Sequence, residues 1–372
     1  NLVDFFYQRA EITEEINTSL KTILDMERLI SRFVIGKIQP RNFIALRQSL
    51  EGAERIRKKL IEHGINSPSI AKLSSGITDM SDLADKIKNI IDDDPALSPE
   101  HGRVIKEGYI PELDRLYELK SDAKSWILKY QEEEKTRLGI NTLRVKYNKI
   151  LGYYIEISKG QADNAPKEYM RKQTLVGGER FTTPELQKFE TDILGASEKI
   201  ADIENKEIDK LRIEITGRSR EIQDTASTIG YIDFICSLSV AAIHNRFIRP
   251  QLNDNNYISI KAGRHPAVEK YYTKEVFIPN DILLDDNDNM IAIITGPNMA
   301  GKSTYIRMCA IIQLLAQTGS FGPAENADIS IADRIFTRIA ASDNISRGES
   351  TFMVEMNETA SILNTATAKS LI

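Results

Sequence analysis

The sequence predicts a multidomain chain of the α plus α/β class, in which a long-helix domain carries a small β-rich insert and precedes an α/β domain. Three patterns support this prediction. Apolar residues recur every three or four positions through much of residues 2–137 and again through 192–246, which is the period of a helix. Between these stretches the pattern alternates, as in strands. After Pro250, short apolar runs are separated by turns rich in Asp and Asn. A length of 372 residues is enough for about two to three domains.

The composition is that of a globular protein with many charged residues. Hydrophobic residues make up 41% and the net charge is −5, so no overall basic excess indicates a nucleic-acid partner. Local charge matters more for such partners, and the sum does not exclude one. Cys236 and Cys309 lie in apolar stretches and are predicted to be buried free thiols of an intracellular protein. No secretory signal is found and no apolar run reaches about 18 residues, so we expect no membrane partner. The chain starts at Asn1 and ends within a pattern at Ile372, which predicts an excerpt of a longer protein.

The first part of the chain is predicted to be helical. Residues 2–62 should form two helices separated at 36–40, because Pro40 stands where a helix can begin. Residues 79–95 and 109–137 are further amphipathic segments, and Gly139 should end the second of these.

A small β-rich insert is predicted next, within residues 124–190. Residues 141–147 and 153–158 alternate apolar and polar side chains, with a turn between them. A third stretch, 170–181, suits a strand and a turn at Gly177-Gly178. A helix follows over residues 192–246, which at 1.5 Å per residue could span roughly 80 Å. Such a rod would hold the insert far from another part of the protein, with bends expected at its glycines, Gly195, Gly217 and Gly230.

The strongest chemical signal is a phosphate-binding loop. Residues 296–303 read Gly-Pro-Asn-Met-Ala-Gly-Lys-Ser and match G-x-x-x-x-G-K-[ST]. An apolar strand is predicted before the loop at 290–295, and a helix after it at 303–318. The glycines would let backbone N–H groups approach a phosphate, Lys302 would reach the β- and γ-phosphates, and Ser303 would hold Mg²⁺. The alternative is a Gly-Lys-Ser turn without a ligand.

The β-rich insert differs in charge from the whole chain. Residues 144–183 contain eight basic and four acidic residues, which gives a local net charge of +4. Phosphate contacts with a duplex need only such local charge. The alternative is a solvated sheet surface with ordinary lysines. The best candidates for phosphate contact are Lys149, Lys159, Arg171 and Lys172.

The loop also carries a family resemblance. Residues 296–304, Gly-Pro-Asn-Met-Ala-Gly-Lys-Ser-Thr, resemble the version found in the MutS mismatch-repair ATPases. Further family-like motifs follow the family's order over nearly the whole chain. These motifs are 152–157 (Gly-Tyr-Tyr-Ile-Glu-Ile), 171–174 (Arg-Lys-Gln-Thr), 183–186 (Thr-Pro-Glu-Leu), 263–266 (Gly-Arg-His-Pro), 277–280 (Phe-Ile-Pro-Asn), 333–338 (Asp-Arg-Ile-Phe-Thr-Arg) and 350–356 (Ser-Thr-Phe-Met-Val-Glu-Met).

The resemblance implies a domain organisation. Residues 1–123 and 191–249 would be the helical core and levers, and 124–190 the clamp that contacts DNA. Residues 250–372 would be the N-terminal half of a P-loop ATPase domain of the ABC type. The family's mismatch-reading and connector domains, with a Phe-x-Glu wedge, would precede Asn1.

The resemblance also implies residue roles. Phe277 would stack on adenine, unless it is a core residue. Asn298 would face the γ-phosphate or its attacking water. Ser350 would reach the partner's γ-phosphate across a dimer or cap the helix from Thr351. His265 is a weaker candidate, better explained as a packed turn residue, and Glu349 stands where some relatives carry a basic residue. The expected ATP-binding set is Gly296, Pro297, Asn298, Met299, Ala300, Gly301, Lys302, Ser303, Thr304, Phe277 and, in trans, Ser350.

The implied activity is DNA mismatch repair by a dimeric, DNA-dependent ATPase that binds mismatched duplex DNA as a sliding clamp. ATP and Mg²⁺ would be its cofactors, a MutL-type protein its downstream partner, and the bacterial cytoplasm, at the nucleoid, its location. The Asp-Glu pair that serves hydrolysis in the family would follow Ile372, so we expect no catalytic residue in this stretch and negligible hydrolysis by it.

Other classes of protein remain as alternatives. One is a MutS relative that works in recombination, which a mismatch-reading domain would distinguish. Another is a structural chromosome ATPase with a coiled-coil arm, although paired arms with sustained heptads are not evident. A transporter ATPase is disfavoured by the rod and the β-rich insert.

Overall fold

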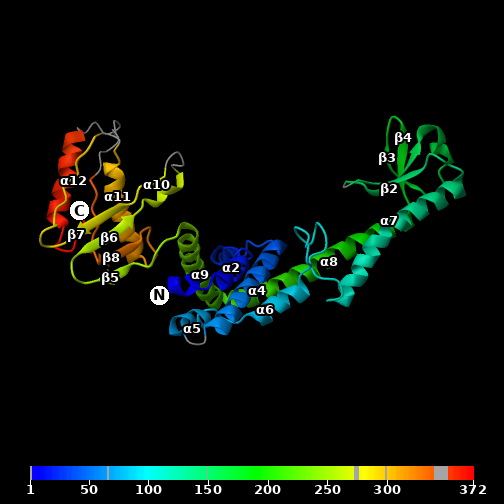
Figure 1. Ribbon diagram of the computed structural model, residues 1–372. Helices are drawn as coiled ribbons and strands as arrows, with labels where there is room; N and C mark the ends of the chain where they lie inside the picture. The colour runs from blue at the N-terminus through cyan, green and yellow to red at the C-terminus, as the bar shows by residue number, and fades with distance from the viewer. Residues whose placement is uncertain (1, 65–66, 149, 272–275, 298–299, 339–350) are drawn as a thin grey trace. The chain divides into compact units, whose positions relative to one another are not determined.

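The computed structural model describes residues 2–64, 67–148, 150–271, 276–297, 300–338 and 351–372 (Figure 1). The chain divides into two compact units. Unit 1 contains Asn1–Lys21, Arg55–Gly76 and Ser227–Ile372, and unit 2 contains Thr22–Glu54 and Ile77–Ala226. Each unit therefore combines segments that are distant in the sequence.

Unit 2 is built around a helical core to which amphipathic helices contribute their apolar faces. The buried residues of this core include Phe33, Phe43, Leu83, Leu113 and Leu211. The helices of unit 2 are α3 (Met26–Ile35), the first part of α4 (Pro40–His63), α6 (Ser81–Ile90), α7 (Pro111–Leu138), α8 (Pro184–Gly217) and the start of α9 (Ser219–Asn245).

Local signals at the helix ends explain several of these bounds. Gly36 and Gly139 adopt the left-handed conformation, with φ of 78° and 67°, and end α3 and α7. Residues other than glycine are disfavoured there, so these two stops were predictable. Pro40 begins α4, as predicted. The Asp25 side chain accepts a hydrogen bond from the N–H of Arg28 and caps the start of α3. This helix start was not predicted, because a single helix was expected before the break at residues 36–40.

The β-rich part of unit 2 is a four-stranded antiparallel sheet of order β1-β2-β4-β3. Its core contains Ile155, Ile157 and Phe181 from the strands, together with Tyr130 from α7 and Leu186 from α8. In Figure 1 the sheet lies where α7 ends and α8 begins. The strands are β1 (Arg144–Asn148), β2 (Gly152–Ser158), β3 (Met170–Thr174) and β4 (Gly178–Thr182), with the short 3-10 helix η1 (Lys159–Asn164) after β2.

The rod predicted over residues 192–246 is two helices. α8 ends at Gly217 and α9 begins at Ser219, with Arg218 between them. Gly195 and Gly230 lie within helices, so only one of the three glycines marks a break. Gly has the highest conformational freedom of any residue, which explains why the helix ends at this position.

Unit 1 combines helices with a second four-stranded sheet of order β5-β8-β6-β7. Strand β6 is antiparallel to β7 and β8, and β5 is parallel to β8. Met308, Cys309 and Ile312 of α11 pack against Ile260 and Ile329 of the sheet. The elements are α1 (Leu2–Tyr7), α2 (Ala10–Leu20), the rest of α4, α5 (Pro68–Ser75), most of α9, β5 (Gln251–Asn253), β6 (Ile258–Gly263), α10 (Pro266–Tyr271), β7 (Asn280–Leu284), α11 (Lys302–Gln317), β8 (Asn326–Ser330) and α12 (Thr351–Thr365).

One predicted strand is wrong. Residues 291–297 belong to neither a helix nor a strand, although an apolar strand was expected at 290–295. Ile291 is 80% exposed and Ile293 is 87% exposed. A strand that is apolar on both faces needs hydrogen-bonded neighbours and cover on both sides, and the described residues pair no strand with it.

Both cysteines are buried free thiols, as predicted, and burial raises the pKa of Cys236 to about 12 and that of Cys309 to about 11. Among the described helices, α9 alone is long and apolar enough to cross a membrane by length and composition. Several of its apolar side chains, including Ile232, Cys236 and Ala242, are buried within the protein, and a core helix passes the same test.

Candidate functional site

The phosphate-binding motif forms a turn that leads directly into α11. Gly301 is the N-cap of this helix and has a φ of 88°, in the left-handed region that favours glycine. The Lys302 ammonium group donates to the backbone oxygens of Gly296 and Pro297, at 2.7 and 2.9 Å. In this structure the carbonyl groups of the motif itself therefore bind the Lys302 ammonium group. Asn298 and Met299 lie outside the described residues.

The first turn of α11 has the groups that a phosphate requires. Gly301 has no side chain that could cap the helix, and an added Cβ there would meet nothing within 4 Å. Among the described residues, the N–H groups of Lys302, Ser303 and Thr304 have no acceptor, and the Ser303 side chain is exposed. Helix N-termini of this kind attract anions through free N–H groups and the helix dipole. The residues present therefore fit a bound phosphate, with a hydroxyl beside it for a divalent cation.

The remaining nucleotide candidates are only partly described. The Phe277 ring is half-buried and packs against the core formed by β6, β7 and α11. Ser350 and Glu349 lie outside the described residues, and α12 begins at Thr351. His265 is buried, and its Nδ1 accepts the N–H of Val268 at 3.3 Å at the start of α10. Burial lowers the pKa of His265, which suits a neutral, packed residue.

The basic candidates on the β1–β4 sheet differ in their surroundings. Arg171 forms an ion pair with Glu179 at 2.8 Å, and Lys172 Nζ donates to the Leu151 carbonyl at 2.6 Å. The Lys159 side chain is exposed at the start of η1 and has no acceptor among the described residues. Lys149 lies outside the described residues. Of the described candidates, Lys159 is therefore the one that is free to meet an anion without losing an internal contact.

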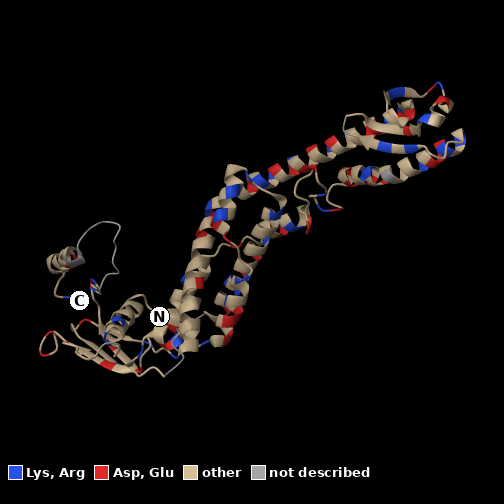
Figure 2. Ribbon diagram, turned by 90° about the horizontal axis from the view of Figure 1, so that it is seen from above, with Lys and Arg blue, Asp and Glu red and all other residues tan. Residues whose placement is uncertain are grey.

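The other charges of the sheet partly compensate one another. Lys146 and Arg180 both pair with Glu156, at 2.7 and 3.4 Å. These contacts lower the pKa of Glu156, with the hydrogen bond from Lys146 as the largest cause. Figure 2 shows acidic as well as basic residues on the sheet. The surplus of positive charge is thus spread over a mixed surface.

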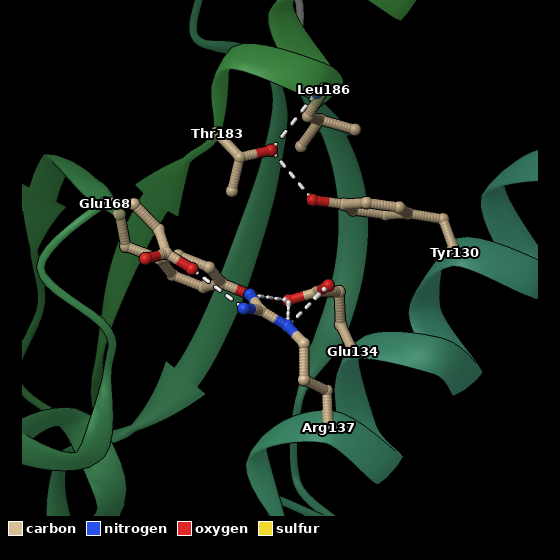
Figure 3. A network of polar contacts seen from close by, with 7 residues as sticks. Tyr130, Glu134, Arg137, Glu168, Thr183 and Leu186 are labelled. Carbon is tan, nitrogen blue, oxygen red and sulfur yellow. Dashed lines mark hydrogen bonds and ion pairs between the residues drawn. The ribbon is translucent and has the colours of Figure 1, made fainter.

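A buried polar network joins the sheet to α7, and the sequence reasoning did not identify it (Figure 3). Glu134 is 8% exposed and accepts hydrogen bonds from Arg137 and from the Tyr169 hydroxyl, the latter at 2.5 Å. Arg137 also pairs with Glu168 at 2.8 Å. Burial, followed by the bond to Glu134, raises the pKa of Tyr169. The spacing of Glu134 and Arg137 on one helix face was the available signal.

An aromatic stack lies at the same junction. The Trp126 ring is stacked on Tyr130 and on Phe189, with centroids 4.9 and 4.0 Å apart. Phe189 in turn meets Tyr153 of β2 edge to face, at 5.6 Å. Tyr130 also exchanges a hydrogen bond of 2.7 Å with Thr183, which caps α8. Aromatic and polar contacts together hold α7, α8 and the sheet to one another.

Comparison with known proteins gives matches in both units. Residues 108–199 match MutS family domain IV, and residues 292–372 match MutS domain V. Over the whole chain, the sequence is 42% identical to the DNA mismatch repair protein MutS of Carboxydothermus hydrogenoformans and 44% identical to that of Alkaliphilus metalliredigens. It is 46% identical, over 96% of its length, to that of Alkaliphilus oremlandii.

The chain spans less than half the length of these relatives, namely 44%, 42% and 40% of the three proteins. Domain IV includes α7, the β1–β4 sheet and the first part of α8, and domain V includes the phosphate-binding motif. The domain matches and the full-length similarity place this chain in the MutS family, as a stretch that carries its domains IV and V.

Proposed function

We propose that this chain works in DNA mismatch repair, as the part of a MutS protein that binds ATP at one site and holds duplex DNA at another. The observation that carries the proposal is the glycine-capped start of α11, with Lys302 beside it, inside the stretch that matches MutS domain V. The relatives are named for DNA mismatch repair. Mismatched duplex DNA is accordingly the proposed substrate.

ATP is the proposed ligand of the motif at residues 296–304. The N–H groups of the first turn of α11 would donate hydrogen bonds to the phosphate oxygens, and the positive end of the helix dipole would favour the negative charge of the phosphates. Lys302 would exchange its bonds to the carbonyls of Gly296 and Pro297 for bonds to the β- and γ-phosphates. Ser303 would hold Mg²⁺, which neutralises phosphate charge when bound. Phe277 would stack on the base, and Ser350 would serve the site of a partner subunit.

The β1–β4 sheet is the proposed DNA clamp. Lys159, Arg171, Lys172 and Lys149 would contact backbone phosphates, which carry no sequence information. Arg171 and Lys172 would first release Glu179 and the Leu151 carbonyl, so Lys159 should contribute most per residue. Residues 1–123 and 191–249 would be the core and levers, and 250–372 the first half of the ATPase domain.

The whole protein is proposed to be a homodimeric, DNA-dependent ATPase that acts in the bacterial cytoplasm, at the nucleoid, with a MutL-type partner. The stretch described here would bind ATP weakly and hydrolyse it negligibly. Hydrolysis needs an activated water in addition to a bound phosphate, and we assign no residue of this stretch to the activation of that water.

Nucleotide binding tests the proposal directly. Isothermal titration calorimetry with Mg²⁺-ATP should show at least about tenfold weaker binding for Lys302→Ala, equivalent to about 1.4 kcal/mol. Lys206→Ala is the matched control, because Lys206 is an exposed lysine of α8 whose ion pair with Asp202 lies outside the motif. Equal affinity in the wild type and in Lys302→Ala would show that the motif does not bind the phosphates.

A further inference from the structure

The C-terminal end of α9 is held by one arginine side chain. Arg264 Nη2 donates to the backbone oxygens of Asn245 and Arg246, at 3.1 and 3.0 Å. Its Nη1 donates to Glu269 at 2.8 Å, and the side chain is 14% exposed. The last carbonyls of a helix lack partners within the helix, and a cation there also interacts favourably with the dipole. Arg264 therefore fastens the end of α9 to the segment between β6 and α10.

The backbone around Arg264 is unusual. Arg246, which follows α9, has a φ of 53°, and Ala262 in β6 has a φ of 48°. Such values are uncommon in residues other than glycine and persist where the surroundings impose them. The pairing of β6 with β7 shifts register between Ile260 and Gly263. A bulge of this kind re-aims the side chains that follow it, and Arg264 is the next residue.

The bulge in β6 is held in place by Asp281, a residue of the neighbouring strand β7. The Asp281 carboxylate accepts the N–H of Ala262 at 2.8 Å and the ammonium group of Lys261 at 3.2 Å. These two contacts, led by the backbone hydrogen bond, lower the pKa of Asp281. The position of Arg264 thus depends on where Asp281 lies.

Asp281 is also bonded to the first turn of α11. The Tyr305 hydroxyl donates to the Asp281 backbone oxygen at 2.9 Å, and Tyr305 stands three residues after Lys302. A continuous set of contacts therefore runs from the phosphate motif through Tyr305, Asp281 and the bulge at Ala262 to Arg264. Its last member binds the carbonyls at the end of α9.

The segment that follows α11 meets the same region. Ile248 and Gly322 exchange two backbone hydrogen bonds, of 2.9 and 2.8 Å, and the Arg264 N–H donates to the Pro323 oxygen at 2.8 Å. The first turn of α11, through Tyr305, and the segment that follows the helix are thus both connected to the surroundings of Arg264. A displacement of this helix, which is packed through Met308 and Ile312, would reach Arg264 because close-packed interiors transmit strain.

We propose that Arg264 is the positioning residue that couples the phosphate motif to the end of α9. The inference rests on the proposed function. Nucleotide binding takes Lys302 away from the carbonyls of Gly296 and Pro297, shifts the first turn of α11, and moves Tyr305 and Asp281 with it. Arg264 passes the shift to α9, which is separated from α8 by one residue, Arg218. The planar guanidinium fork is needed because it holds two carbonyls and a carboxylate at once.

The test measures the coupling between the two ligands in the full-length protein. The dissociation constant for mismatched duplex DNA is measured with and without Mg²⁺ and a slowly hydrolysed ATP analogue. In the wild type the ratio of the two constants should differ from one by at least about fivefold. In Arg264→Ala the ratio should fall to within about twofold of one. In the absence of DNA, the analogue should bind this variant with nearly wild-type affinity. A merely structural role would change affinities without removing the ratio.

Three further variants sharpen the result. Arg264→Lys should recover only part of the ratio, because an ammonium group lacks the fork geometry. Tyr305→Phe removes one hydroxyl at the other end of the path and should also reduce the ratio. Arg249→Ala is the matched control: Arg249 is a nearby arginine that pairs with Asp4 at 3.3 Å, and its loss should leave the ratio unchanged.

The outcomes separate the two proposals. If the two dissociation constants are equal in the wild type, so that their ratio is one, the proposed function is overturned, and the coupling with it. A wild-type ratio that persists in Arg264→Ala would overturn the coupling role alone. Should Arg264→Ala fail to fold, judged by circular dichroism, Tyr305→Phe decides: an undiminished ratio in that variant also overturns the role of this path.

Discussion

Replacing Glu204 with alanine should destabilise unit 2 by about 4 kcal/mol. Glu204 lies on α8 and is fully buried, and its Oε1 accepts two consecutive backbone N–H groups, those of Val104 and Ile105, at 2.9 and 3.0 Å. Alanine leaves both N–H groups buried without an acceptor. Each such group costs about 1–3 kcal/mol, so the pair amounts to about 2–6 kcal/mol.

Urea unfolding followed by tryptophan fluorescence measures this change. Trp126 is the single tryptophan of the chain and lies in α7 of unit 2, so its emission reports on the unit that contains Glu204. The midpoint should fall without a change in slope if only stability is altered. A loss below about 1 kcal/mol would refute the reasoning, because it would mean that water or another group satisfies the two N–H groups.

Glu204→Gln is the matched variant, since it keeps an oxygen acceptor and removes the charge. Burial raises the pKa of Glu204, and the hydrogen bonds from Ile105 and Val104 hold back part of that rise. The folded state therefore binds the proton more tightly than the unfolded state. The resulting stability is present below the unfolded pKa and is lost as the pH rises through the folded pKa. Relative to the wild type, Glu204→Gln should thus gain stability as the pH rises above the unfolded pKa of about 4.3. A stability difference that does not change with pH would contradict the raised pKa.

Three other predictions concern the β1–β4 sheet and its junction with the helices. Phe189→Ala removes the half-buried ring stacked on Trp126. We expect a red-shifted emission and a loss of about 1–3 kcal/mol in the same urea assay, whereas an unchanged spectrum would argue against the stack. Glu134→Gln keeps an acceptor for Tyr169 but loses the charge that Arg137 contacts. We expect the free energy of unfolding to fall by about 1–3 kcal/mol. Glu132→Gln, on the exposed face of α7, is the control. Lys159→Ala should weaken duplex binding equally for all sequences and lower the salt slope by about one, and a slope equal to that of the wild type would remove Lys159 from the proposed DNA contact.

Several elements could be predicted because their signals are local. Gly36 and Gly139 end helices through their own backbone preference, and the alternation at residues 153–158 indicates a strand with one buried face. The phosphate motif is recognised from eight neighbouring residues, and the structure brings Gly296, Pro297 and Lys302 together. The strand expected at 290–295 failed for the opposite reason, since a strand exists only with a partner that lies elsewhere in the chain.

By itself, the sequence determined the helical periods, the change to alternation near residue 141, the glycine-capped motif before α11 and the resemblance to the MutS family. Only the tertiary structure decided that Glu204 is buried against Val104 and Ile105, that Glu134 binds Tyr169, and that Arg264 holds the end of α9. The physical reason is distance along the chain. Periods and caps depend on residues a few positions apart, whereas these contacts join groups 18 to 100 residues apart. No local preference records which of these groups the folded chain will bring together.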